Sequence, residues 1–413
     1  MATTIRSHAF IVGHFQHKID AQALEKANWV KVVEDEKSYA FLCSYFHKSH
    51  VDAMIEAEGQ QRPKFLNDVH HYRLDLNANV PLSTYNAATG RLVVLEGYKL
   101  NIISLHVYFM PLDITLYAIE VDDSGSDLND LTLAHLFLRE FSSRWEQFND
   151  EFKRALEPIK VLCSNGMSSE MESCGNKLKI FQILMVNEEA WTEGHLYEIG
   201  TCSPLDIVGK NHNLTPSDEY YNTIIKNNKI APFKTWMSLA LMDSYTALIK
   251  SVGEFNEVAW GAEKTKWVKS YYRFIFLRVV MQEAFISSEN VRYRLNHSNA
   301  NIIRDLARMD QYYFYNNISY NFLPDMLNKQ MAGGMSIDEE KAELSTQIKE
   351  WDNKNSNTLM GILSVFAIIS LVNDVYCVAV GVTSNRLPMF LSFISTLALI
   401  CILFLIVRLI RRN

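Results

Sequence analysis

The most unusual chemical group in this chain is a carboxylate in apolar surroundings, Asp374, with Asn373 beside it. Both residues lie in the run Leu359 to Val382, which is otherwise mostly apolar. A charged Asp near the centre of a membrane helix costs roughly 2.5 to 3.5 kcal/mol, so Asp374 needs water or a partner. Several copies of the chain around a hydrated axis would form an acidic ring that attracts cations. Alternatively, the two polar residues mark a helix break, or Asp374 is protonated in a packed bundle.

A second apolar run, Leu387 to Val407, follows the first after a short polar turn at Thr383 to Arg386. Each run has about the 20 residues that a helix needs to cross a bilayer, so together they predict a two-helix transmembrane hairpin. The outer flanks of the two runs are basic: Lys349, Lys354, Arg408, Arg411 and Arg412. Because positive flanks stay in the cytoplasm, we expect a multi-pass protein of the inner membrane, in contact with lipid, with both termini cytoplasmic.

The composition is that of a folded, acidic protein. The 413 residues are 48% hydrophobic and carry a net charge of -7, which disfavours a nucleic acid duplex as partner and is compatible with handling cations. The chain shows no secretory leader, and its six cysteines form no CxxC pair, so we expect buried thiols. Phosphate-binding loops, dinucleotide fingerprints and catalytic signatures are also missing. We therefore expect neither an enzyme nor a covalently bound cofactor.

The first half of the chain predicts an α/β cytosolic domain over residues 1–233. Its clearest element is a β-hairpin, Ile102 to Phe109 with Ile114 to Val121, in which a proline sets the turn. Apolar residues at helical spacing then predict one amphipathic helix from Ala134 to Pro158, where the proline ends it. Leu178 to Val186 predicts a further strand.

The following region, residues 234–356, predicts helices only, and residues 357–413 form the predicted hairpin with its basic tail. Three long segments with few helix breakers carry this prediction: Thr235 to Phe255, Lys266 to Leu295 and Ala300 to Gln330. Ser336 and Glu339 then have the spacing of a capping box. From Ile337 onward we expect a single stalk helix of about 40 residues that runs into the first apolar segment.

The order of these elements resembles that of the CorA family of divalent-cation channels. The likeness in residues is sharpest at the first apolar run, where Asn357, Met360, Leu363 and Ser364 fall in the register of the family pattern. Family members close this helix with Gly-Met-Asn, whereas this chain has Gly381, Val382 and Thr383 at the selectivity-motif position. Only the glycine is kept, so the resemblance does not extend to magnesium selectivity.

The resemblance implies a homopentamer with a central pore that passes Mg²⁺ or another divalent cation. It implies the following pore-lining residues: Asn357, Met360, Leu363, Leu371, Asp374 and Thr383. Met360, Leu363 and Leu371 would then be hydrophobic constrictions, or else ordinary packing and lipid-contact residues. No metal ligands can be assigned from the sequence.

Two functions follow from the resemblance. The first is a CorA-like channel or transporter for divalent cations, gated by its cytosolic domain. The alternative is an ancillary effector of type III CRISPR systems, opened by a nucleotide messenger such as adenylated S-adenosylmethionine, that compromises the membrane in antiviral defence. For a nucleotide ligand, Arg139 and Arg144 are candidate phosphate contacts, and surface salt bridges are their alternative role. A third option is a domain merely anchored by a hairpin.

Overall fold

The computed structural model describes residues 2–16, 19–86, 91–166, 178–202, 216–251, 272–295 and 299–381. The chain divides into two compact units. Residues Met1–Ser288 and Met309–Asp338 form the first, called here the α/β unit. Residues Glu289–Arg308 and those from Glu339 onward form the second, called here the helical unit. Three helices therefore begin in one unit and end in the other.

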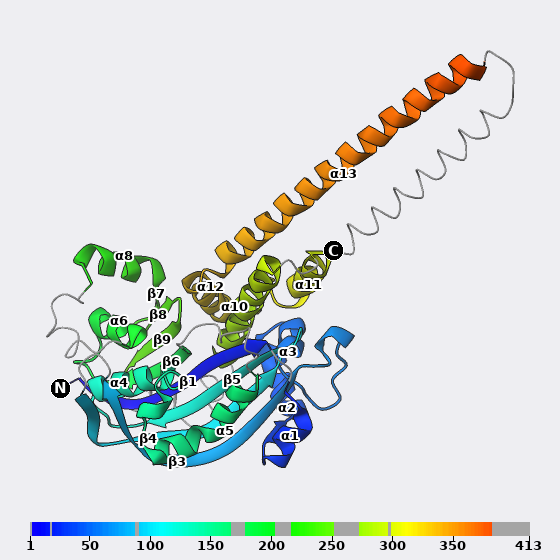
Figure 1. The fold of residues 1–413 in the computed structure, drawn as a ribbon. Helices are drawn as coiled ribbons and strands as arrows, with labels where there is room; N and C mark the ends of the chain where they lie inside the picture. The colour runs from blue at the N-terminus through cyan, green and yellow to red at the C-terminus, as the bar shows by residue number, and fades with distance from the viewer. Residues whose placement is uncertain are drawn as a thin grey trace. The chain divides into compact units, whose positions relative to one another are not determined.

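The α/β unit is built on a nine-stranded mixed sheet in the order β2-β3-β4-β5-β1-β6-β9-β8-β7 (Figure 1). Its strands are β1 (Thr4–Gln16), β2 (Val30–Val32), β3 (His70–Asn86), β4 (Arg91–Phe109), β5 (Ile114–Asp123), β6 (Lys179–Val186), β7 (Lys229–Phe233), β8 (Trp236–Leu241) and β9 (Ser244–Lys250). Neighbouring strands are antiparallel except β6 and β9, which pair in parallel from Ile180↔Ser244 to Val186↔Lys250. The central strands are buried on both sides because helices cover both faces.

One face of the sheet packs against the helices α4 (Leu128–Arg139), α5 (Asp150–Gly166), α6 (Glu193–Thr201) and α8 (Asp218–Asn228). Side chains of β5 such as Ile119 share a core with Phe137 of α4 and Leu156 of α5. A second core joins Leu184 of β6 to Leu196 of α6. These helices form where apolar residues recur at three or four positions, which gives each an apolar stripe for the sheet.

The opposite face carries α10 (Arg273–Arg294) and α12 (Phe322–Gly334). Phe181 of β6 lies 5.6 Å, between ring centroids, from both Phe276 of α10 and Tyr245 of β9. On β8, the side chain of Ser238 hydrogen-bonds Gln330 of α12. The remaining short elements of this unit are α1 (Ala21–Lys26), α2 (Glu36–Tyr45), α3 (Lys48–Met54) and two 3₁₀ turns, η1 (Lys64–Leu66) and η2 (Trp145–Gln147).

The helical unit combines the end of α10, most of α11 (Asn299–Tyr312) and most of α13 (Ile337–Gly381). Arg292 of α10 contacts Asp305 of α11, with 3.3 Å between guanidinium and carboxylate. Tyr293 Oη donates to the carbonyl of Gln347 on α13. The predicted stalk helix is thus confirmed as one uninterrupted helix of 45 residues.

The transmembrane hairpin is a wrong prediction. Within the described residues, no helix combines the length and the apolar character needed to cross a bilayer. Residues 359–381 of the first apolar run form the second half of α13, whose first half is rich in charge and whose second half contains Asn373 and Asp374, while Val382 lies outside the described residues. Asp374 carries the insertion cost noted above. The predictions of a membrane fold and of a multi-pass inner-membrane location are therefore wrong. The second apolar run, Leu387 to Val407, lies outside the described residues.

Three further predictions of secondary structure are also wrong. The segment Ala300 to Gln330 is not one long helix, because α11 ends at Tyr312 and α12 begins at Phe322. The segment Thr235 to Phe255 contains β8 and β9 instead of a helix, because tertiary pairing with β6 overrides the local pattern. The amphipathic stretch after Ala134 is two helices with η2 between them, and Pro158 lies inside α5 rather than at its end. The β4–β5 hairpin and the strand β6 are confirmed.

Candidate ligand-binding cavity

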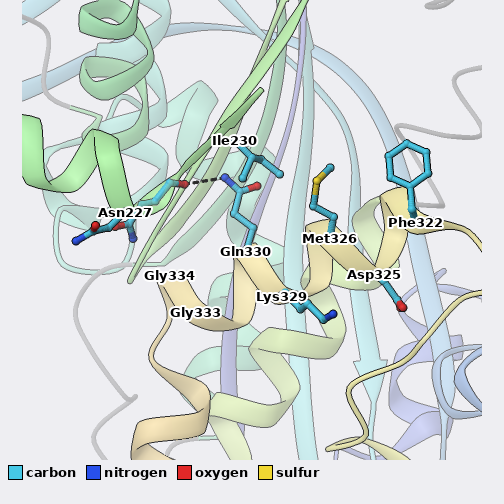
Figure 2. Close-up of a pocket in the computed structure, with 10 residues that line it drawn as sticks. Asn227, Ile230, Phe322, Asp325, Met326, Lys329, Gln330, Gly333 and Gly334 are labelled. Carbon is cyan, nitrogen blue, oxygen red and sulfur yellow. Dashed lines mark hydrogen bonds between the residues drawn. The ribbon is translucent and has the colours of Figure 1, made fainter. Parts of the chain in front are cut away.

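A cavity of about 760 Å³ lies along α12 in the α/β unit, next to the end of α8 and the start of β7 (Figure 2). This volume is within the range of about 300–1,000 Å³ that is typical of small-molecule sites. The following residues line it: Asn227, Asn228, Ile230, Phe322, Asp325, Met326, Lys329, Gln330, Gly333 and Gly334.

The lining residues of α12 share one side of the helix because they recur at intervals of three and four. The helix begins at Phe322, and Pro324 and Asp325 stand in its first turn, where proline is tolerated and a carboxylate favours the helix dipole. It ends at Gly333 and Gly334. In Figure 2, Phe322, Met326 and Gln330 project in series along the helix. Phe322 is 70% exposed, so the cavity offers an aromatic surface at one end.

Hydrogen bonds fix the opposite end of the cavity. Gln330 Nε2 donates to the carbonyls of Asn228 and Ser238 over 2.7 and 3.1 Å, while its Oε1 accepts from the Ser238 hydroxyl. Asn228 Nδ2 donates to the carbonyl of Ala240. One glutamine thereby joins α12 to both α8 and β8, so the wall of the cavity is rigid where these three elements meet.

The two glycines that end α12 have different roles. A Cβ on Gly334 would lie 2.7 Å from the carbonyl carbon and oxygen of Ala240, so only glycine allows this approach to β8. A Cβ on Gly333 would meet nothing within 4 Å. The backbone of α12 is therefore bare at Gly333 on the side that lines the cavity.

Two charged residues border the cavity. Asp325 Oδ1 accepts the backbone N–H groups of Ile318 and Ser319, at 2.8 and 3.2 Å, which anchors α12 to the preceding loop. Lys329 is exposed, and no ion pair of its ammonium group occurs within the described part of the chain. Lys329 is therefore the cationic group available to a ligand, whereas Asp325 has a structural task.

The residues predicted to line a pore lie elsewhere. Asn357 and Asp374 belong to α13, as do Met360, Leu363 and Leu371, which are exposed there. Gly381 is the last residue of α13, and Val382 and Thr383 lie outside the described residues. These positions belong to the helical unit, and the cavity belongs to the α/β unit. Their assignment to a pore stays a prediction.

The structure places Arg139 and Arg144 away from the cavity, on or just after α4. Arg139 is buried, donates from Nε to the Leu178 carbonyl over 3.0 Å and pairs with Asp243. Arg144 pairs with Glu140, four residues before it. Both guanidinium groups therefore have local partners, and Arg139 is a core residue rather than a surface one.

A second concentration of polar side chains is buried on the α10 face of the sheet. His71 Nε2 contacts His106 Nδ1 at 2.9 Å, and His106 Nε2 lies 2.9 Å from Glu120 Oε2. The Ser104 hydroxyl donates to the same carboxylate oxygen, 2.6 Å away. Ser104 and Glu120 therefore both lie at Nε2 of His106. In a catalytic relay the serine and the carboxylate contact opposite nitrogens of the imidazole, so this cluster is not arranged as one.

Burial sets the protonation of this cluster. It lowers the pKa of His106 to about 4, against the opposing influence of Glu120. Burial alone would raise the pKa of Glu120. The hydrogen bond from His106 and the charge of Arg273, 3.6 Å away, outweigh burial and hold this pKa well below its usual range. A neutral His106 therefore donates to an ionised Glu120. The cluster ties α10 to the sheet through Arg273.

Sequence reasoning missed both the cavity and this cluster. Polar residues at alternate positions of apolar strands, such as Ser104 and His106 on β4, could have indicated the cluster. The glycine pair Gly333 and Gly334 could have indicated where the helix beside the cavity ends. Among the described residues, no group of three or more His, Cys, Asp or Glu side chains is placed to hold a metal ion.

Comparison of the chain with protein-family models, with curated proteins and with solved structures gives no match. The likeness to CorA channels stays a prediction from the residues of the first apolar run.

Proposed function

We propose that this chain is a ligand-gated effector in which the cavity along α12 binds a small nucleotide messenger and the helical unit responds. One observation carries the proposal: the helix that forms the cavity wall ends only two residues before α13 begins. Along the chain, only Met335 and Ser336 separate the helix that binds the ligand from the helix that would respond.

The chemistry of the cavity suits a nucleotide. The exposed ring of Phe322, with Met326 and Ile230, provides a flat apolar surface for a base. Lys329 provides a positive charge for phosphate. The lining residues of α12 extend from Phe322 to Gly333, which is about 16 Å along a helix, so an elongated ligand with a ring at one end can span it.

The junction between α12 and α13 is suited to transmit the bound state. Ser336 has a φ of 52°, in the left-handed region that non-glycine residues rarely occupy, so the chain turns sharply between the helices instead of continuing one helix. α13 then continues from the α/β unit into the helical unit without interruption. A ligand that binds two arrangements of this junction with different affinity shifts the population between them.

From the effector alternative implied by the resemblance, this proposal keeps the nucleotide ligand and not the action on a membrane, because that action depends on the same hairpin as the channel. Cation conduction by a CorA-like channel stays an untested prediction. The membrane hairpin on which it depends is not found among the described helices.

Isothermal titration of the full chain with ATP and AMP tests binding. We expect Lys329→Ala and Phe322→Ala each to weaken binding about 5- to 30-fold, the effect of losing one charged or stacking contact. Lys226→Ala and Tyr220→Ala are matched controls, because both side chains are exposed on α8 and neither lines the cavity. Absence of binding up to about 1 mM, or equal losses in the controls, contradicts the proposal.

Hydrogen exchange of the same samples tests the response. We expect bound nucleotide to change exchange rates in the first turns of α13, from Ile337 onward, as well as in α12. A change confined to α12 and α8 would show a binding site without transmission.

A further inference from the structure

His8 of β1 lies between two carboxylates of the neighbouring strand β5. Its side chain is 1% exposed, Nδ1 lies 2.5 Å from Asp122 Oδ1, and Nε2 lies 3.8 Å from Glu120 Oε1. The second distance is too long for a hydrogen bond, and Nε2 has no hydrogen-bond partner among the described residues. Two acceptor groups therefore face the two ring nitrogens of one buried histidine.

The number of protons on this histidine decides which carboxylate it can bind. A neutral imidazole carries one N–H, and the short contact assigns that proton to Nδ1, which donates to Asp122. Nε2 then directs a buried lone pair toward the acceptor oxygen of Glu120. One additional proton on Nε2 would turn this unfavourable approach into a charge-assisted hydrogen bond. Because the Asp122 side chain is 31% exposed, solvent reaches the edge of this site.

The groups around His8 that could compete for such a proton do not titrate near pH 6. The titratable and charged groups of this region are Glu120 and Asp122 of β5, His106 and Tyr108 of β4, His71 and Arg73 of β3, Glu34 after β2 and Arg273 of α10. Burial lowers the pKa of His106 to about 4 and the pKa of His71 well below its usual range, so both imidazoles are neutral there. Burial raises the pKa of Tyr108, which keeps its proton.

The Glu120 oxygen that faces His8 also holds the start of α10. Arg273 is the first residue of this helix, and its Nη1 lies 3.6 Å from the same Oε1. Its guanidinium lies over the ring of Phe10, which is on the same side of β1 as His8 because the two are two residues apart. A proton on His8 Nε2 therefore brings a second positive charge to the oxygen that attracts Arg273. That charge weakens the attraction and repels the guanidinium.

We infer that His8 is a pH-sensitive switch for the attachment of α10 to the sheet. At pH 8 Nε2 carries no proton, and Glu120 holds Arg273. As the pH falls to about 5.5, within the range in which histidine changes charge, Nε2 takes up a proton and donates to Glu120 Oε1. The first turns of α10 are then held less firmly. This switch does not require the nucleotide of the proposed function.

NMR of the histidine ring nitrogens in the full chain follows the proton directly. The signals of His8 are assigned by their loss in His8→Gln. We expect Nε2 of His8 to give the signal of a bare nitrogen at pH 8 and that of an N–H at pH 5.5, while Nδ1 carries its proton at both. A proton on Nε2 at pH 8, or none at pH 5.5, overturns the inference.

Hydrogen exchange of α10 peptides between Arg273 and Gln282 tests the consequence. After correction for the pH dependence of the exchange reaction itself, we expect about tenfold lower protection at pH 5.5 than at pH 8, the effect of one weakened ion pair. His8→Gln should abolish this difference, because its amide can donate to Asp122 but takes up no proton. His195→Gln is the matched control, since His195 lies on α6 at the other face of the sheet, and it should keep the difference.

The unchanged chain alone can overturn the inference, because equal protection of α10 at the two pH values would show that no switch acts on this helix. A difference that persists in His8→Gln, or that His195→Gln or His106→Gln abolishes instead, assigns the response to another group and also overturns it.

Discussion

Arg278 of α10 donates from Nη1 to Asn328 Oδ1 of α12 over 2.7 Å, in the interior of the α/β unit. The same guanidinium donates to the carbonyls of Tyr313 and Tyr315 and lies over the Tyr315 ring, 4.8 Å from its centroid. Burial lowers the pKa of Arg278 to about 10. Within the described residues, its hydrogen bonds all go to neutral oxygens, so this side chain holds α10, α12 and the loop before α12 together.

Replacement of Asn328 should therefore destabilise the α/β unit. Asn328→Leu leaves part of a buried guanidinium without an acceptor, and we expect a loss of about 2–4 kcal/mol in the free energy of unfolding. Denaturant unfolding measures it. Asn321→Ala is the control, because Asn321 precedes the same helix but is exposed and its side chain does not cap the helix. Equal losses in the two variants would argue against a structural role for the Arg278–Asn328 contact.

The two glycines at the end of α12 should respond oppositely to alanine. Gly334→Ala places a methyl group 2.7 Å from the Ala240 backbone, and we expect a loss of about 1–3 kcal/mol from overpacking. Gly333→Ala meets open space and should be neutral or stabilising by up to about 1 kcal/mol, because alanine favours the helix. Thermal unfolding of both variants checks this. Similar melting temperatures for the two would show that α12 does not approach β8 as closely as described.

Glu289, near the end of α10 in the helical unit, should make stability depend on pH. Burial raises its pKa to about 7, against the opposing charge of Arg292 and with support from Asp305. A carboxyl with a folded pKa above its unfolded value of 4.5 stabilises fully below pH 4.5, and this contribution is lost as the pH rises through 7. The loss is up to about 3 kcal/mol.

Glu289→Gln keeps the neutral shape at every pH, so it should stabilise the helical unit at pH 8 and have little effect at pH 5. Hydrogen exchange of α11 peptides that end at or before Arg308, measured at the two pH values, reports on this unit. Glu339→Gln is a matched control, because Glu339 is an exposed residue of α13. A stabilisation at pH 8 no larger than that of the control contradicts the buried position of Glu289.

His106 should give the α/β unit the opposite dependence on pH. Its pKa is lowered by burial from 6.5 to about 4, so unfolding takes up a proton between these values. Stability should fall by up to about 3 kcal/mol as the pH is lowered from 6.5 to 4. Exchange of β4 peptides should accelerate over this range, and His106→Gln, whose amide can still donate to Glu120, should reduce the acceleration. His195→Gln is the control, since His195 is only partly buried. An unchanged pH dependence in His106→Gln would mean that another group titrates.

The elements that were correctly predicted are those whose pattern is local. The β4–β5 hairpin follows from two apolar β-rich runs and a turn that contains Pro111, which are neighbours in sequence. α13 follows from a long stretch without proline. By contrast, residues 235–255 have apolar content that suits either a helix or a buried strand, and only the pairing of β8 and β9 with the rest of the sheet decides between them.

The sequence by itself determined the local elements with one clear periodicity and the presence of a long helix after residue 336, because both depend on side chains within a few residues of each other. The tertiary structure decided the parallel pairing of β6 with β9, the approach of Gly334 to Ala240 and the burial of Arg139 and Arg278. It also decided the position of the cavity, whose lining joins residues 227–230 to residues 322–334. The physical reason is that each of these features is a contact between segments far apart in the chain, and such contacts leave no spacing pattern in the sequence.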